Sequence, residues 1–150
     1  GIKGNMFYMY KFRTMYFERN QSFKNIIQAK IEDKRITRVG KFLRKYSLDE
    51  LPQLINVIKG EMSLVGPRPH AIQHNEYYRK LIRGYMQRHS KLPGMTGLAQ
   101  INGARGETSN IENMKLRINY DLEYNNNWSL IKDFEILLNS IFEVIQGNGY

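Results

Sequence analysis

The sequence predicts an α+β fold in which mainly amphipathic helices surround a small β-hairpin or sheet. Apolar residues recur at spacings of three and four in several segments, which is the pattern of helices with one buried face. Shorter runs rich in aromatic and β-branched residues indicate strands, and turns containing Gly or Pro separate them. The chain has 150 residues and shows no repeat or internal linker, so residues 1–150 are expected to form a single domain.

The first predicted strand covers residues 6–15 and is rich in aromatic side chains. Gly4 and Asn5 before it are typical of a turn. A hairpin at this point needs an earlier strand, and residues 1–3 are too few to supply one. We therefore expect the chain to be a fragment of a longer protein. The polar stretch 16–33 gives no prediction of structure.

Residues 35–46 have the period of an amphipathic helix with one basic side. That basic side comprises Lys34, Arg38, Lys41 and Lys45. A second helix follows, with an apolar stripe at Leu51, Leu54, Ile55 and Ile58. It begins either at Ser47, which has the capping-box spacing to Glu50, or only at Pro52, because proline disfavours a helical conformation of the preceding residue.

The spacing of apolar residues and the positions of turn residues predict the remaining helices and strands. Residues 62–65 and 98–101 are short strand candidates. Helices are expected over residues 71–87, 109–125 and 129–146. No uninterrupted apolar stretch approaches the roughly 18 residues of a membrane span, and the chain has no cysteine for a disulfide or a thiolate metal site.

The formal net charge of the chain is +9, and the whole excess lies in residues 1–46. Such a basic block usually faces a polyanion, which can be nucleic acid, an anionic membrane surface or phosphate groups in a site. A basic amphipathic helix suits a membrane interface, and a basic face in water is the alternative. The chain shows no zinc-finger spacing, RNP sequence or recognition helix, so we expect no nucleic-acid partner.

Asp49 and Glu50 form an adjacent carboxylate pair with arginines before and after it in the sequence. Both lie within one turn of the N-terminus of the predicted second helix. Free amides and the helix dipole favour carboxylate and phosphate groups at that end. Two carboxylates are also suitable ligands for a hard cation. The pair therefore indicates phosphoryl-transfer chemistry. The alternative is that Glu50 closes a capping box and Asp49 complements the helix dipole.

Basic residues near this pair are candidates for binding phosphate. Prolines on both sides of Arg68 stiffen its loop, which lowers the entropy lost when the guanidinium binds a phosphate through two bonds. The alternative is a turn that leaves Arg68 in solvent. Lys11 and Arg13 alternate with Tyr10, Phe12 and Thr14 on the predicted first strand, so both can point to one face. His70 and His74 lack a third ligand, so a pair on a surface helix is favoured over a metal site.

Ordered blocks over nearly the whole chain resemble the bacterial sugar transferases, the monotopic polyprenyl-phosphate phosphoglycosyl transferases. The blocks are KFRTM (11–15), ITRVGKFLR (36–44), SLDELPQ (47–53), SLVGPRP (63–69) and PGMTG (93–97). Two later stretches, NGARGET (102–108) and NWS (127–129), are similar to the branch that primes exopolysaccharide with a hexose phosphate. Several blocks in the right order are far more specific than any one of them.

The resemblance implies transfer of a sugar-1-phosphate from a UDP-sugar to undecaprenyl phosphate in two steps. In the family's pattern Asp49 is the nucleophile, and Glu50 is its acidic partner at a Mg²⁺ site that both carboxylates form. Arg44 and Arg68 match arginines that hold phosphate. The further candidates for binding phosphate or substrate are Lys11, Arg13 and Arg105.

The resemblance also implies a membrane-associated catalytic domain at the cytoplasmic face of the bacterial inner membrane, in contact with an anionic membrane surface. The hydrophobic re-entrant helix that the family carries upstream of the first block is not expected within residues 1–150. A homo-oligomer remains open. The alternative function is a non-catalytic basic module that binds membrane or nucleic acid through residues 1–46.

Overall fold

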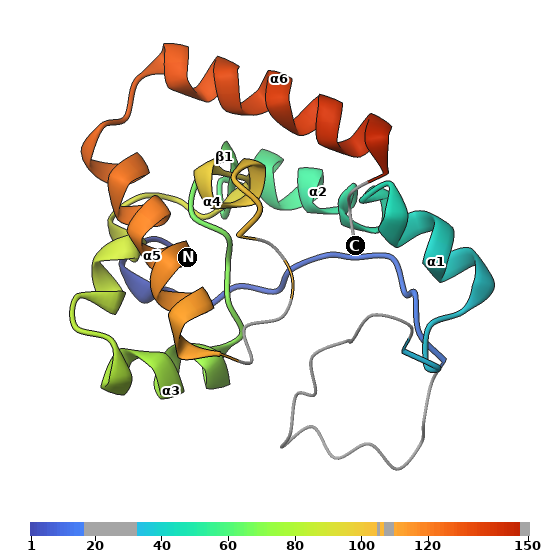
Figure 1. The fold of residues 1–150 in the computed structure, drawn as a ribbon, viewed down its shortest axis with the longest axis horizontal. Coiled ribbons are helices and arrows are strands. Elements are labelled where there is room, and N and C mark those ends of the chain that lie inside the picture. Colours follow the sequence, from blue (N-terminus) through green and yellow to red (C-terminus); the bar gives the residue numbers. More distant parts are fainter. Residues whose placement is uncertain (17–32, 105, 107–109, 148–150) are drawn as a thin grey trace.

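The computed structural model describes residues 1–16, 33–104, 106 and 110–147, which are mainly helical around a small sheet and confirm the α+β class (Figure 1). The α-helices are α1 (Arg38–Lys45), α2 (Gln53–Ile58), α3 (Ile72–Leu81), α4 (Leu98–Ile101), α5 (Ile111–Asn126) and α6 (Leu130–Gln146). Short 3-10 helices are η1 (Ile2–Gly4), η2 (Leu48–Glu50) and η3 (Tyr85–Ser90). The strands are β1 (Ser63–Val65) and β2 (Gly94–Thr96).

The sheet consists of β1 and β2, which run parallel with Ser63 opposite Gly94 and Val65 opposite Thr96. The predicted strand at 62–65 is thereby confirmed to within one residue. A parallel pair cannot be joined by a tight turn, so the sheet is not the hairpin that the sequence suggested.

The predicted strand at 98–101 is wrong, because these residues form α4 and the strand lies earlier, at 94–96. Close approach of two chain segments explains the shift. A Cβ at Gly94 would lie 2.1 Å from the backbone nitrogen of Gly66, so only glycine allows β2 to lie so near the end of β1.

Residues 6–15 do not form the predicted strand, and within the described residues only an isolated antiparallel bridge at Met15 has strand pairing there. The side chain of Asn56 holds the segment instead. Its Nδ2 donates to the backbone oxygen of Tyr8 at 2.8 Å, and its Oδ1 accepts from the backbone nitrogen of Tyr10 at 3.1 Å. Since Asn56 is fully buried, these bonds replace the water that its amide loses.

The chain enters α2 through η2, and Pro52 rather than Ser47 precedes the helix. Ser47 has a left-handed backbone with φ of 52°, and its side chain makes no capping bond, so the capping box is wrong. The start near Pro52 is confirmed, because α2 begins at Gln53. Asp49 and Glu50 therefore lie outside the α-helix, where their side chains can contact other elements.

Two predicted helices are shorter than their apolar periods suggested. In place of a helix over 35–46, α1 begins after Thr37, whose Oγ1 accepts a bond of 2.8 Å from the backbone nitrogen of Gly40. In place of a helix over 71–87, α3 ends at Leu81, and Gly84 follows with a left-handed φ of 79°. The basic residues predicted along one side of α1 are exposed.

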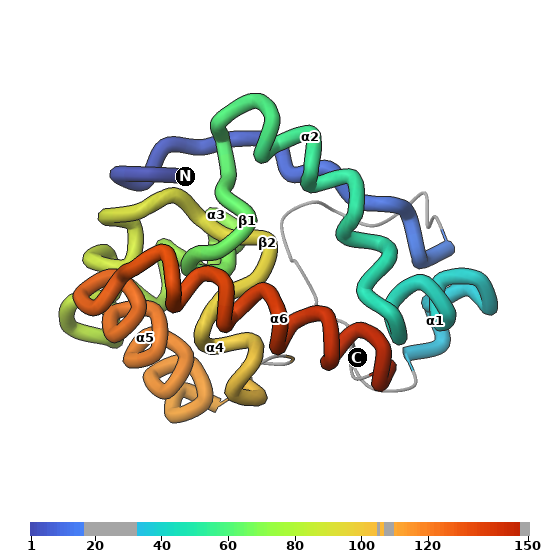
Figure 2. Tube along the Cα trace, turned by 90° about the horizontal axis from the view of Figure 1, so that it is seen from above, coloured from blue at the N-terminus to red at the C-terminus, as the bar shows by residue number. Residues whose placement is uncertain are grey.

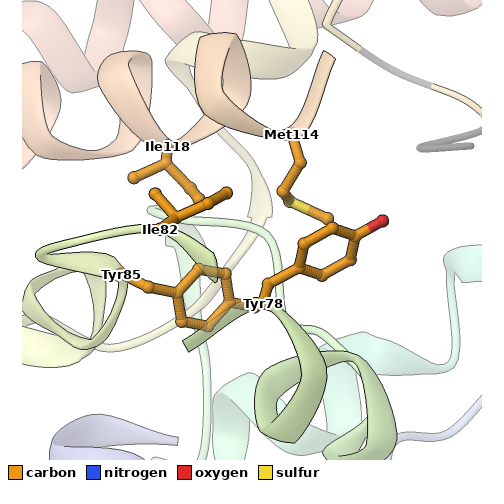
Figure 3. Close-up of a cluster of buried hydrophobic side chains, with 5 residues drawn as sticks. All are labelled: Tyr78, Ile82, Tyr85, Met114 and Ile118. Atoms are coloured by element: carbon orange, nitrogen blue, oxygen red, sulfur yellow. The ribbon is translucent and has the colours of Figure 1, made fainter. Parts of the chain in front are cut away.

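The buried core has two clusters, and α5 contributes to both. The first contains Tyr78, Ile82, Tyr85, Met114 and Ile118, which pack between α3, η3 and α5 (Figure 3). The second contains Val65, Tyr124 and Ile136, so it joins β1, α5 and α6. The core therefore fixes α6 over the sheet.

Helix α6 runs across the sheet region from α5 toward α1 (Figures 1 and 2). A Cβ at Gly147, just after α6, would lie 2.7 Å from Cε of Lys45 at the end of α1, which confirms that the two helix ends meet. None of the described helices is long and apolar enough to cross a membrane.

Candidate active site

A cavity of about 560 Å³ lies between η2, the loop after β1 and one side of α6. The predicted site residues in its lining are Asp49, Glu50, Lys11, Arg44 and Arg68. Leu137, Ser140 and Val144 of α6 form part of the opposite wall. The fold thus brings both carboxylates and three of the predicted cations into one cavity from segments far apart in the sequence.

Asp49 lies in the middle of η2, and only 7% of its surface is exposed. Its backbone oxygen accepts a bond of 3.0 Å from the backbone nitrogen of Phe12, which ties η2 to the amino-terminal segment. Burial raises the pKa of the Asp49 carboxyl, and the charge of Glu50 adds to this effect, whereas Lys11 and Arg44 oppose it. Asp49 is therefore a weakly hydrated carboxylate beside cations.

The carboxylate of Glu50 binds two cations. Arg68 Nη1 donates to Oε2 at 3.0 Å, Arg68 Nη2 donates to Oε1, and Lys11 Nζ donates to Oε1 at 2.6 Å. Burial alone would raise the pKa of Glu50, but the charges and hydrogen bonds of Arg68 and Lys11 outweigh it and hold this pKa well below its usual range. Glu50 is therefore ionised at neutral pH. The alternative of an Arg68 that only faces solvent is wrong.

The other predicted cations have different positions. Arg44 lines the cavity from the last turn of α1, and its Nε donates to Oγ1 of the buried Thr14 at 2.8 Å. Arg13 is exposed and is not among the residues that line the cavity. The segment of Lys11 and Arg13 is not the regular strand on which their shared side was predicted. Arg105 lies outside the described residues.

Arg88 is buried and supports the loop that carries Arg68. Its guanidinium pairs with Asp121 of α5, with 2.8 Å between Nε and Oδ2 and 2.6 Å between Nη2 and Oδ2. Nη2 also donates to the backbone oxygen of Arg68 at 2.6 Å. The position of Arg68 in the cavity therefore depends on an ion pair that is almost completely buried.

The cavity lining also contains polar residues outside the predicted site, among them His70, Gln100 and Arg117. Arg117 Nε donates to the backbone oxygen of Ala104 at 2.9 Å. Gln100 Nε2 donates to the backbone oxygen of Met95 at 2.9 Å, whereas its Oε1 is buried without a partner. Burial lowers the pKa of Arg117 to about 10, assisted by the nearby charges of other arginines.

The interpretation of His70 and His74 as a pair on a surface helix is wrong, because His70 lies in the loop before α3. Its position two residues after Arg68 was the signal that could have placed it in the site. A signal also existed for Arg117. Together with Asp121 it follows Met114 at helical spacing, and charged residues on the buried face of a helix call for a partner or a ligand.

The two carboxylates are compatible with a Mg²⁺ ion whose remaining ligands come from water and a bound substrate. The described residues contain no group of three His, Cys, Asp or Glu side chains that could hold a metal. Mg²⁺, however, often takes only one or two carboxylates together with water and substrate phosphates. The three bonds to Glu50 leave about one of its four acceptor positions free, and Asp49 is adjacent in the cavity wall.

A model of the family described as bacterial sugar transferase matches residues 1–147. A UDP-glucose:undecaprenyl-phosphate glucose-1-phosphate transferase of Klebsiella pneumoniae is 54% identical over 143 residues, which are 95% of this chain and 30% of that protein. The protein of the same name in Escherichia coli (strain K12) is 52% identical, with the same coverage. A galactosyl transferase of Streptococcus agalactiae is 41% identical over 99% of this chain and 34% of that protein. The chain thus spans about a third of the length of these relatives.

Proposed function

Since this chain belongs to the bacterial sugar transferase family, we propose that it transfers a hexose-1-phosphate from a UDP-sugar to undecaprenyl phosphate. The names of the relatives from Klebsiella and Escherichia support this donor and this acceptor. The observation that carries the proposal is the buried carboxylate of Asp49 in a cavity lined by Lys11, Arg44 and Arg68. The reaction is the priming step of exopolysaccharide, capsule or O-antigen synthesis.

The first step forms a covalent intermediate on Asp49. Its carboxylate attacks the phosphorus that bears the sugar, the bond from this phosphorus to the bridging oxygen breaks, and UMP leaves with that oxygen and the electron pair. In the second step a phosphate oxygen of undecaprenyl phosphate attacks the same phosphorus, and the bond to Asp49 breaks. The carboxylate is thereby restored, and the lipid diphosphate sugar is released.

The cations make this attack feasible. A carboxylate approaches a diphosphate slowly because both are negatively charged, so phosphoryl transfer depends on positioning and on neutralising charge. Burial raises the pKa of Asp49, and the charges of Lys11 and Arg44 oppose this effect, which supports their role beside the attacking carboxylate. Glu50 holds Arg68 and Lys11 in the cavity wall and thus positions them for phosphate oxygens. Arg105 remains a candidate of the same kind.

Asp49 and Glu50 would hold a Mg²⁺ ion, which the bound donor would complete with oxygen ligands. Oxygen ligands of this type favour a hard cation, and the acceptor capacity of Glu50 supports the fit. The ion supplies further neutralisation of the diphosphate charge. Activity is then expected to require Mg²⁺ and to disappear with a chelator.

We place the chain at the cytoplasmic face of the inner membrane. The exposed apolar side chains of α6 share one helix face, and they are Leu130, Ile131, Phe134, Leu138, Ile141, Phe142 and Ile145. Contiguous exposed apolar patches mark interaction sites, and a helix with such a face suits a membrane interface. The neighbouring face of α6 lines the cavity, so the acceptor's phosphate can reach Asp49 from a lipid surface. Exposed cations along α1 favour anionic lipids.

The test uses membranes from cells that produce the complete gene product. With UDP-glucose, undecaprenyl phosphate and Mg²⁺, we expect release of UMP and formation of a lipid-linked sugar. Asp49→Asn should abolish both, whereas Glu112→Gln, which changes an exposed carboxylate on α5, should leave both unchanged. Near-normal turnover by Asp49→Asn would remove Asp49 from the nucleophile role. No UMP release from any of a panel of UDP-sugars would favour a non-catalytic basic module.

A further inference from the structure

His70 has one ring nitrogen bound inside the protein and one without a partner. Nδ1 lies 2.9 Å from Arg88 Nη1 and 2.7 Å from the hydroxyl of Tyr85. A guanidinium can only donate hydrogen bonds, so Nδ1 accepts the bond from Arg88, and the single hydroxyl hydrogen of Tyr85 then serves either Nδ1 or Asn75 Oδ1, which lies 2.7 Å from the hydroxyl. In the neutral ring the hydrogen is then on Nε2. The tautomer of His70 is therefore set by Arg88, which Asp121 holds in turn.

Nε2 of His70 is buried and has no hydrogen-bond partner among the described residues, although His70 is part of the cavity lining. Buried polar groups in folded proteins almost always have a partner, and a donor left without one costs free energy. Because Arg88 and Tyr85 occupy the Nδ1 side, Nε2 is the nitrogen that remains, and since this atom is buried, a bond to a molecule in the cavity requires a small movement of the cavity wall. The structure therefore maintains an unmet donor at the site.

The charges around His70 identify the kind of acceptor. Burial and the charge of Arg88 lower the pKa of His70 well below its usual value, and Arg117, His74 and Arg68 contribute to the same effect. The ring is thus neutral at neutral pH and lies within a cluster of cations. The carboxylates of Glu50 and Asp121 are already paired with Arg68 and Arg88. An anionic oxygen on a ligand is the acceptor that suits this environment.

We propose that His70 donates a hydrogen bond from Nε2 to a phosphoryl oxygen of the nucleotide diphosphate in the cavity. This inference rests on the proposed function and adds a binding residue to it. His70 does not enter the covalent chemistry of Asp49. Its effect is on affinity for the phosphate part of the donor, and it is distinct from that of Arg68, whose guanidinium is engaged with Glu50.

Two substitutions separate the two ring nitrogens. His70→Asn places an amide oxygen near the position of Nδ1, so it can still accept from Arg88, but it has no donor near the position of Nε2. His70→Gln places its amide nitrogen near the position of Nε2 and can restore the bond. In the complete gene product we expect His70→Asn to raise the KM for UDP-glucose roughly tenfold to a hundredfold, with little change in kcat. His70→Gln should recover most of the affinity.

Binding measurements test the inference independently of turnover. Calorimetric titration of the same proteins with UMP should show the same loss of affinity for His70→Asn, whereas titration with uridine should not. His89→Asn is the matched control, because His89 lies outside the cavity lining and should leave UMP binding unchanged. Absence of UMP release by the wild-type protein would contradict the proposed function but would leave this binding test intact.

Two results would overturn the inference. Equal UMP affinity together with an equal KM for UDP-glucose in the wild type and His70→Asn would show that Nε2 makes no bond to either phosphate. An equal loss of affinity for UMP and uridine would place the contact on the nucleoside instead. If His70→Asn does not fold, as judged by its thermal melting curve, His70→Gln still decides the matter, because unchanged structure with strongly weakened UMP binding would contradict the role of the Nε2 donor.

Discussion

The guanidinium of Arg68 spans both carboxylate oxygens of Glu50, with 3.0 Å between Nη1 and Oε2 and a second bond from Nη2 to Oε1. Two parallel bonds fix the plane of the guanidinium as well as its distance. Lys11 binds the same carboxylate, so Glu50 positions cations from two distant segments. In the proposed reaction, the acidic residue next to Asp49 thus positions the arginine and the lysine for the substrate.

Arg68→Lys should reduce kcat/KM for the UDP-sugar by roughly tenfold to a hundredfold, because lysine keeps the charge but cannot form two parallel bonds. Arg79→Lys is the control, since Arg79 forms only an exposed pair with Glu76 on α3. Steady-state kinetics of both variants check the expectation. Wild-type kinetics for Arg68→Lys would mean that its planar geometry has no role in the reaction.

Lys11→Met should shift the acid limb of the pH–rate profile to higher pH. The nucleophile must be deprotonated, burial raises the pKa of Asp49, and Lys11 lowers it. Loss of this cation raises the pKa further, so activity is lost at a higher pH as the solution is acidified. The profile of kcat/KM against pH measures the shift, with Lys115→Met on the exposed side of α5 as control. A shift to lower pH would contradict the assignment of the limb to Asp49.

Asp121→Asn should destabilise the fold strongly, by about 3–5 kcal/mol, because it leaves the buried charge of Arg88 without its counterion. Glu112→Gln breaks the exposed pair with Lys115 and should cost less than about 1 kcal/mol. Chemical denaturation of the two variants beside the wild type gives both free energies of unfolding. Similar losses for the two would show that burial of the Arg88 pair does not matter.

Leu138→Glu should weaken binding to vesicles that contain anionic lipid, because Leu138 lies on the exposed apolar face of α6. Asn139→Glu adds the same charge on the other side of the helix and should have a smaller effect. Co-sedimentation at low and high salt separates apolar from ionic contributions, since salt screens only the latter. Equal binding by both variants to neutral and anionic vesicles would exclude this face and the basic residues of α1 from the membrane contact.

The local part of the structure follows from the sequence. Helices α5 and α6 agree with the predicted ranges to within two residues at each end. Apolar residues that recur every three or four positions indicate directly that one helix face is buried. The pair Asp49 and Glu50, the stiff loop at Arg68 and the start of α2 near Pro52 are local features of the same kind. The ordered blocks also predict the family correctly.

Contacts between residues far apart in the sequence could be identified only from the tertiary structure. The segment 6–15 has the composition of a strand, yet strands need partners, and the buried side chain of Asn56 took the backbone bonds that a neighbouring strand would have made. Lys11 of this segment lines the cavity, whereas Arg13 is not among the lining residues. The pairing of Arg88 with Asp121, the tautomer of His70 and its unmet Nε2 donor depend on contacts across 18 to 33 positions. Chemistry carried by one short segment can be predicted from its residues, whereas burial and pairing are decided by which segments the fold brings together.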